Sequence, residues 1–217
     1  MFSYTPMKKL AGIRLEADYF TFQVLNHTIH EVADRFAHEN TDDADVLMGL
    51  AYDARKAMEQ AREVLQPLEE YEEVGIRYGV KIIWPTLLLQ ARMLREAMSI
   101  GPSNARFQSI TYDLEAVIED AIKDQFGAKA EQVLFHWKRL STLTPGTADK
   151  ITPLGAMFSA WSAKERSVRM IALLEAFNPM YASWVDIIKK QGQPVIEPDE
   201  MAAWARREWV DPETGKP

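Results

Sequence analysis

The first 17 residues alternate between apolar and polar positions, as residues of a half-buried β-strand do. Phe2 and Tyr4 alternate with a polar neighbour, and Ile13 and Leu15 do the same further along. The segment between them contains a proline and suits a turn. The sequence therefore predicts a short N-terminal β-hairpin over 1–17. A two-stranded ribbon is only marginally stable alone, so we expect the hairpin to pack on the rest of the chain.

From residue 21 onward, apolar residues recur at spacings of three and four, which places them on one face of an α-helix. Leu25, Ile29 and Val32 form such a stripe. Pro85 suits the first turn of a later helix, and Gly127 suits a helix C-terminus. We expect helices over 21–39, 41–66, 85–99, 107–126, 128–140, 153–177, 179–191 and 198–210.

These elements predict a mainly α fold, a single-domain bundle of about seven helices preceded by the short N-terminal β-hairpin. The segment 141–153 is the best candidate for a linker, but each side of it has too few helices for an independent core. A chain of 217 residues can bury roughly 70% of its unfolded surface. We therefore expect one domain over 1–217, with a frayed tail at 211–217.

Composition excludes several classes of chemistry. The chain has no cysteine, which excludes thiol nucleophiles, disulfides and cysteine-based metal sites. Its formal net charge of −7 disfavours binding to nucleic acid. The longest stretch without a charged residue, 151–163, is shorter than the about 20 apolar residues of a membrane helix. The N-terminus lacks the pattern of a secretory signal. We expect a cytoplasmic protein with no membrane partner, no nucleic-acid partner and no cofactor.

A cluster of histidines is the first candidate site. His27, His30, Asp34 and His38 lie in one predicted helix, at spacings that resemble a set of metal ligands. On a helical wheel they lie opposite the apolar stripe. This placement is typical of a solvated helix face, and that is the first interpretation. The alternatives are a metal or catalytic site completed by another helix or subunit, and a pH response at an interface.

Glu165 and Arg169 form a second candidate, because side chains at positions i and i+4 of a helix can meet. In the first half of the predicted helix 153–177 the apolar residues share one face, and Glu165 and Arg169 fall on that same face. Beyond this pair, the apolar residues lie on a different face. One interpretation is that the helix kinks or changes neighbours and leaves the pair at its rim. The other is a buried ion pair with a perturbed carboxylate pKa.

Trp204 and Trp209 lie on a short C-terminal helix that needs a further surface to bury them. Docking onto the rest of the chain is the first interpretation. A subunit or partner interface is the alternative.

The sequence has no phosphate-binding glycine loop, no nucleophile elbow and no metal-binding helix motif, so we assign no catalytic residue. Two stretches resemble a bacterial family known as a domain of unknown function. They are Gly12-Ile13-Arg14-Leu15 leading into Asp18-Tyr19, and Tyr78-Gly79-Val80-Lys81-Ile82-Ile83-Trp84-Pro85-Thr86. The resemblance covers most of the chain. It implies a bacterial, cytoplasmic, helical protein and carries over no functional residue.

Two functional hypotheses follow. The first is a non-enzymatic binding or interaction protein that self-associates as a homo-oligomer, because catalytic motifs are missing and the terminal tryptophans need a surface. The second is a metal-dependent, hydrolase-like enzyme that uses His27, His30, Asp34 and His38. Neither hypothesis decides whether the protein binds a small-molecule ligand.

Overall fold

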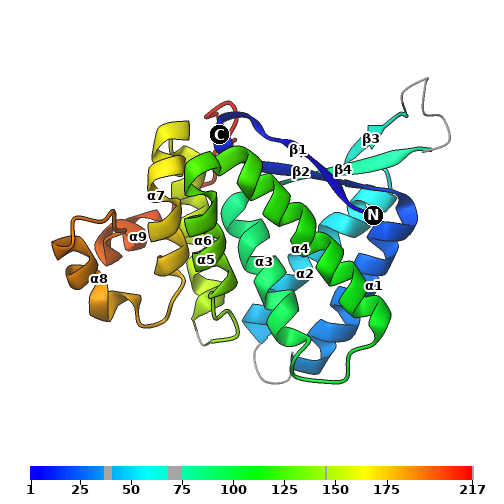
Figure 1. Ribbon diagram of the computed structural model, residues 1–217, viewed down its shortest axis with the longest axis horizontal. Coiled ribbons are helices and arrows are strands. Elements are labelled where there is room, and N and C mark those ends of the chain that lie inside the picture. The colour runs from blue at the N-terminus through cyan, green and yellow to red at the C-terminus, as the bar shows by residue number, and fades with distance from the viewer. Residues whose placement is uncertain (37–40, 68–74, 145, 217) are drawn as a thin grey trace.

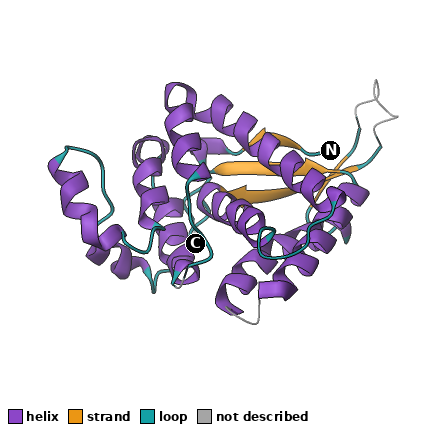
Figure 2. Ribbon diagram, turned by 60° about the horizontal axis from the view of Figure 1, so that its bottom comes forward, coloured by secondary structure: helices purple, strands orange, loops and turns teal. Residues whose placement is uncertain are grey.

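The computed structural model describes residues 1–36, 41–67, 75–144 and 146–216 (Figure 1). It is mainly α, as the sequence predicted, with a small antiparallel sheet at one side (Figure 2). The strands are β1 (Ser3–Pro6), β2 (Gly12–Ala17), β3 (Glu63–Leu65) and β4 (Arg77–Ile83). Short 3-10 turns occur at η1 (Lys8–Leu10) and η3 (Gly127–Lys129). The α-helices are α1 (Tyr19–Phe36), α2 (Thr41–Met58), α3 (Trp84–Ala97), α4 (Ala105–Phe126), α5 (Ala130–Lys138), α6 (Thr147–Ala160), α7 (Ala163–Ala176), α8 (Tyr181–Lys190) and α9 (Pro198–Trp204).

The sheet has the strand order β1-β2-β4-β3, and all its neighbours are antiparallel. The predicted hairpin is confirmed as β1 and β2, in a register that pairs Tyr4 with Leu15. On its other edge β2 pairs with β4, and Leu15 lies opposite Val80. Ile13, Leu15, Val80 and Ile82 are buried on one face of the sheet. Figure 1 shows α1, α2, α3 and α4 lying below the sheet.

The expectation of an entirely helical chain after the first hairpin is wrong, because β3 and β4 form a second hairpin. The helix predicted over 41–66 ends at Met58. Gln60 then adopts a left-handed φ of 58°, and the Ala61 N–H donates to the Lys56 carbonyl at 2.9 Å. This bond is that of a Schellman-type helix end, where glycine is the usual left-handed residue. The end of α2 therefore lacks the glycine that ordinarily signals such a helix end in a sequence.

Gly12 starts β2 and lies close to the backbone of β4. A Cβ atom added at Gly12 would lie 2.1 Å from the Ile82 carbonyl oxygen of β4. No larger side chain fits there without moving a strand.

The helix predicted over 153–177 is two helices, α6 and α7, which separate at Trp161. Ser162 caps α7. Its Oγ accepts a hydrogen bond from the Glu165 N–H at 3.3 Å, and its own N–H donates to the Glu165 carboxylate at 2.8 Å. This reciprocal pair is a capping box. The change of apolar face in the sequence marks this break.

The C-terminal tail, for which the sequence predicted fraying, contacts the turn of the N-terminal hairpin and β4 through Glu213. The Glu213 carboxylate accepts hydrogen bonds from the Lys8 N–H at 3.0 Å and from Lys81 Nζ at 2.9 Å. Buried apolar side chains form one continuous cluster that reaches from Phe2 to Ile196. Within the described parts of the chain, no helix is both long and apolar enough to cross a bilayer.

Candidate functional site

The predicted histidine cluster lies on an open face of α1. The side chains of His27, His30 and Asp34 are exposed, and the His27 ring lies 5.8 Å from that of Phe107. His38 is outside the described residues. Among the residues that are described, no group of three or more His, Asp or Glu side chains is arranged to hold a metal ion. The three described members of the cluster are thus on the solvated face, where the first interpretation put them.

Glu165 and Arg169 do not form a buried ion pair, so that interpretation is wrong. Glu165 is exposed and closes the capping box, and its hydrogen bonds with Ser162 lower its pKa below the usual range. Arg169 turns to Glu200 instead, with Nη2 2.9 and 2.8 Å from the two carboxylate oxygens. Its guanidinium carbon also lies 4.5 Å from the centre of the Trp161 ring. Glu165 thus stabilises the start of α7, whereas Arg169 links α7 to α9.

Both C-terminal tryptophans rest on the chain itself. The Trp209 ring lies against Gly155 of α6, where an added Cβ would be 2.3 Å from the indole. Trp204 is half-buried and packs on the main apolar cluster. Trp209 is still 41% exposed. Both side chains therefore dock at least in part on the rest of the chain, and an interface role stays a prediction.

Arg166 is the charged side chain that this region buries, and the sequence did not single it out. It is 1% exposed and donates to four backbone carbonyls. The acceptors are Phe158 at 3.0 Å, Ser159 at 2.8 Å, Lys9 at 3.0 Å and Pro212 at 3.0 Å. Phe158 and Ser159 lie in the last turn of α6, where the helix dipole favours a cation. Burial lowers the pKa of Arg166. Arg166 thus joins α6 to the hairpin turn and the tail, which is a structural role.

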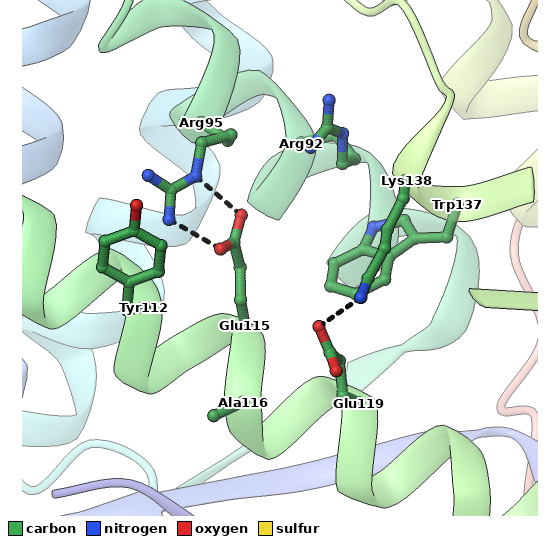
Figure 3. Close-up of a pocket in the computed structure, with 8 residues that line it drawn as sticks. All are labelled: Arg92, Arg95, Tyr112, Glu115, Ala116, Glu119, Trp137 and Lys138. Atoms are coloured by element: carbon green, nitrogen blue, oxygen red, sulfur yellow. Dashed lines mark hydrogen bonds and ion pairs between the residues drawn. The ribbon is translucent and has the colours of Figure 1, made fainter. Parts of the chain in front are cut away.

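A cavity of about 580 Å³ is formed by residues of α3, α4 and α5. Figure 3 shows two ion pairs on opposite sides of it, Arg95 with Glu115 and Lys138 with Glu119, and Arg92 between them. The cavity wall carries one more cation than carboxylate, in a chain whose net charge is −7. Its lining residues are Arg92, Arg95, Tyr112, Glu115, Ala116, Glu119, Trp137 and Lys138.

Arg95 is fully engaged in this wall. Its Nε and Nη2 donate to the two oxygens of Glu115 at 2.8 and 2.6 Å, and its Nη1 donates to Gln108 at 2.9 Å. Its guanidinium carbon lies 4.2 Å from the centre of the Tyr112 ring. The hydrogen bonds with Glu115 raise the pKa of Arg95. Arg95 and Glu115 therefore form a rigid, bidentate pair.

Arg92 is a cation of this wall that has an unused donor within the described parts of the chain. Its Nε is buried and has no hydrogen-bond partner among the described residues. Its ion pair with Glu96 is long, at 3.7 Å. The other oxygen of Glu96 accepts from the N–H and Oγ1 of Thr142 at 2.7 and 2.9 Å, and from the Leu143 N–H at 3.1 Å. Glu96 is thereby held on the loop after α5, and it does not satisfy Arg92.

Consecutive residues of α5 complete the wall. The Trp137 Nε1–H donates to the Leu88 carbonyl at 2.9 Å, which fixes a ring that is 1% exposed. The Lys138 ammonium lies 2.7 Å from Glu119 and is about half exposed. The wall thus combines a fixed aromatic ring with a half-exposed lysine that pairs with Glu119.

A family model matches residues 2–209 of the chain, nearly its whole length. The chain belongs to the family described as a domain of unknown function (DUF6904). The resemblance to a family of unknown function is therefore confirmed. The DUF6904 match includes every residue that lines the cavity. No curated protein and no solved structure matches the chain. The functional argument therefore rests on the geometry of the site.

Proposed function

We propose that this protein binds a small anionic molecule in the cavity between α3, α4 and α5. The observation that carries the proposal is the buried Arg92 Nε, which has no hydrogen-bond partner among the described residues. A buried donor without an acceptor is costly, and a guanidinium favours a carboxylate or phosphate as its acceptor. An anion in the cavity supplies that acceptor.

The remaining wall supports an anion that also carries a flat apolar part. Tyr112 and Ala116 are exposed and offer apolar surface, and the volume of about 580 Å³ lies within the range of small-molecule sites. Glu115 and Glu119 are each paired with a cation, which reduces their repulsion of an anion. After these two pairs, Arg92 is the positive charge of the wall that no carboxylate of the lining offsets. An aromatic carboxylate or an aryl phosphate matches this combination.

This proposal develops the binding-protein hypothesis drawn from the sequence. Self-association is a separate prediction, which concerns surfaces away from the cavity. The metal-dependent alternative gains no support from the described geometry, because His27, His30 and Asp34 lie on an open helix face.

Calorimetric titration with phenyl phosphate and with benzoate, at constant ionic strength, tests the proposal. Charged hydrogen bonds contribute about 1.5–3 kcal/mol, so Arg92→Gln should weaken binding by roughly tenfold or more. Ligand at about ten times its Kd should stabilise the wild type by roughly 1.4 kcal/mol and raise its Tm by about 3–6 °C. The matched control is Arg206→Gln, at an exposed arginine of the C-terminal region. Equal affinity in wild type and Arg92→Gln, or no saturable heat with either probe, would refute the proposal.

A further inference from the structure

A second cavity, of about 210 Å³, includes the next face of α5. Trp137 and Lys138 of this helix line the first cavity, whereas His136 lines the second. We propose that this second cavity, called here the Trp184 cavity, binds a small carboxylate. Its lining residues are His136, Arg139, Leu140, Ser141, Leu174, Glu175, Asn178 and Trp184.

The indole of Trp184, on α8, supplies the first argument. Its Nε1 is buried and has no hydrogen-bond partner among the described residues. An indole N–H can only donate, so its partner must be an acceptor. Buried donors in native proteins nearly always have such a partner. Trp184 is one of the residues that line the cavity, so we infer that its acceptor is held there.

Arg139 supplies the second argument, because it brings a positive charge that the described residues do not neutralise. Its guanidinium carbon lies 5.0 Å from the centre of the Phe135 ring. No carboxylate of the described chain lies within 4.0 Å of it. A cation and an indole N–H among the residues that line one cavity favour an acceptor that is negatively charged.

The acidic residue in the wall does not oppose this assignment. Glu175 Oε1 lies 2.5 Å from His136 Nδ1, so its charge is turned toward the imidazole. Asn178 Oδ1 accepts from the Met180 N–H at 2.9 Å, which leaves the amide NH₂ as its free donor. Ser141 adds a hydroxyl. The groups left for a ligand are therefore mainly donors, as the two oxygens of a carboxylate require.

The volume restricts the size of the ligand. One water molecule occupies about 30 Å³ in the liquid, so 210 Å³ has room for about seven non-hydrogen atoms. Acetate and carboxylates of about three or four carbons fit this limit. The aryl anions proposed for the first cavity are larger, so the two sites should differ in selectivity.

The experiment uses the indole N–H signals in a ¹H–¹⁵N correlation spectrum, where the six tryptophans give one signal each. The signal that is missing in Trp184→Phe is assigned to Trp184. The wild type is then titrated with sodium acetate, and sodium chloride at equal ionic strength and pH is the control. We expect the Trp184 signal to move to lower field and to saturate. The Trp137 signal should stay in place, because its N–H already donates to Leu88.

Variants separate this site from the first. Arg139→Gln, at an exposed residue, should weaken acetate binding by roughly tenfold. Arg92→Gln should leave it unchanged, so the two proposals fail or hold independently. A Trp184 signal that does not move, that moves without saturating, or that responds equally in Arg139→Gln would overturn the inference. The titration is made on the wild type, and Trp184→Phe serves only to assign the signal.

Discussion

Replacing Arg166 with methionine tests how the C-terminal half is joined to the hairpin. Methionine is unbranched and replaces the aliphatic part of the arginine side chain, but it lacks the guanidinium that donates to four carbonyls. Two of those hydrogen bonds, to Phe158 and Ser159, are buried. The other two, to Lys9 and Pro212, are partly buried, and their carbonyls can turn to water.

The expected loss follows from these acceptors. Each buried carbonyl left without a donor costs about 1–3 kcal/mol, so the two together cost about 2–6 kcal/mol. Removing a desolvated cation recovers part of this sum, and the loss of the ring contact with Phe158 adds to it. We expect a net loss of about 3 kcal/mol. For a chain of this length, the corresponding fall in Tm is about 6–12 °C.

Urea and thermal unfolding measure the loss, with Arg206→Met as the exposed control. Hydrogen exchange adds a local test, because the segments around Lys9 and Pro212 should lose protection before α6 does. The guanidinium stays charged at all ordinary pH values, so the deficit should be the same at pH 6 and pH 9. A loss below about 1 kcal/mol, with unchanged exchange in both segments, would refute the reasoning.

Three further predictions concern the α6–α7 region. Gly155→Ala should displace the Trp209 ring, which lies 2.3 Å from the added Cβ, and shift the tryptophan emission to the red. In a Trp209→Ala background the same change should stabilise the fold by up to about 1 kcal/mol, through helix propensity; a stability loss in both backgrounds would contradict this. Ser162→Ala should cost about 1 kcal/mol at pH 7 through loss of the cap, measured by urea unfolding. Hydrogen bonds with Ser162 lower the pKa of Glu165 from its ordinary 4.5, so this carboxylate stabilises the fold above that pH and loses its effect as the pH falls through the lowered pKa. The stability difference between wild type and Glu165→Gln should therefore shrink on acidification, and a constant difference would contradict the assignment.

The first hairpin and most helices could be predicted from the sequence, because each is signalled within its own segment. The second hairpin was missed for a physical reason. Apolar spacing suited to a helix continues past Met58 to Val64, and the left-handed residue that ends α2 is Gln60, which carries no turn signal. The break between α6 and α7 was partly visible, because Ser162 and Glu165 have the spacing of a capping box.

The candidate sites were harder to predict, because they depend on residues that are distant in the sequence. Arg92 is one of the few charges on a helix that is otherwise largely buried, and that contrast was the available signal. Its unused Nε is visible only once Glu96 is seen to bind the loop at Thr142. Arg166 binds carbonyls at positions 9, 158, 159 and 212, a set that no local pattern reveals. Glu165 and Arg169 show the converse, since correct spacing did not make them partners.

The pairing of β2 with β4 joins strands that all of α1 and α2 separate along the chain. Forming it requires the closure of a long loop, whose entropy cost must be met before the contacts form. The β1–β2 hairpin and the α1–α2 contacts are local and can form earlier. Once Leu15 lies opposite Val80, α1 and α2 belong to the loop that this strand pair closes. The N-terminal half should consequently melt as one cooperative block, with no stage at which α1 or α2 detaches alone.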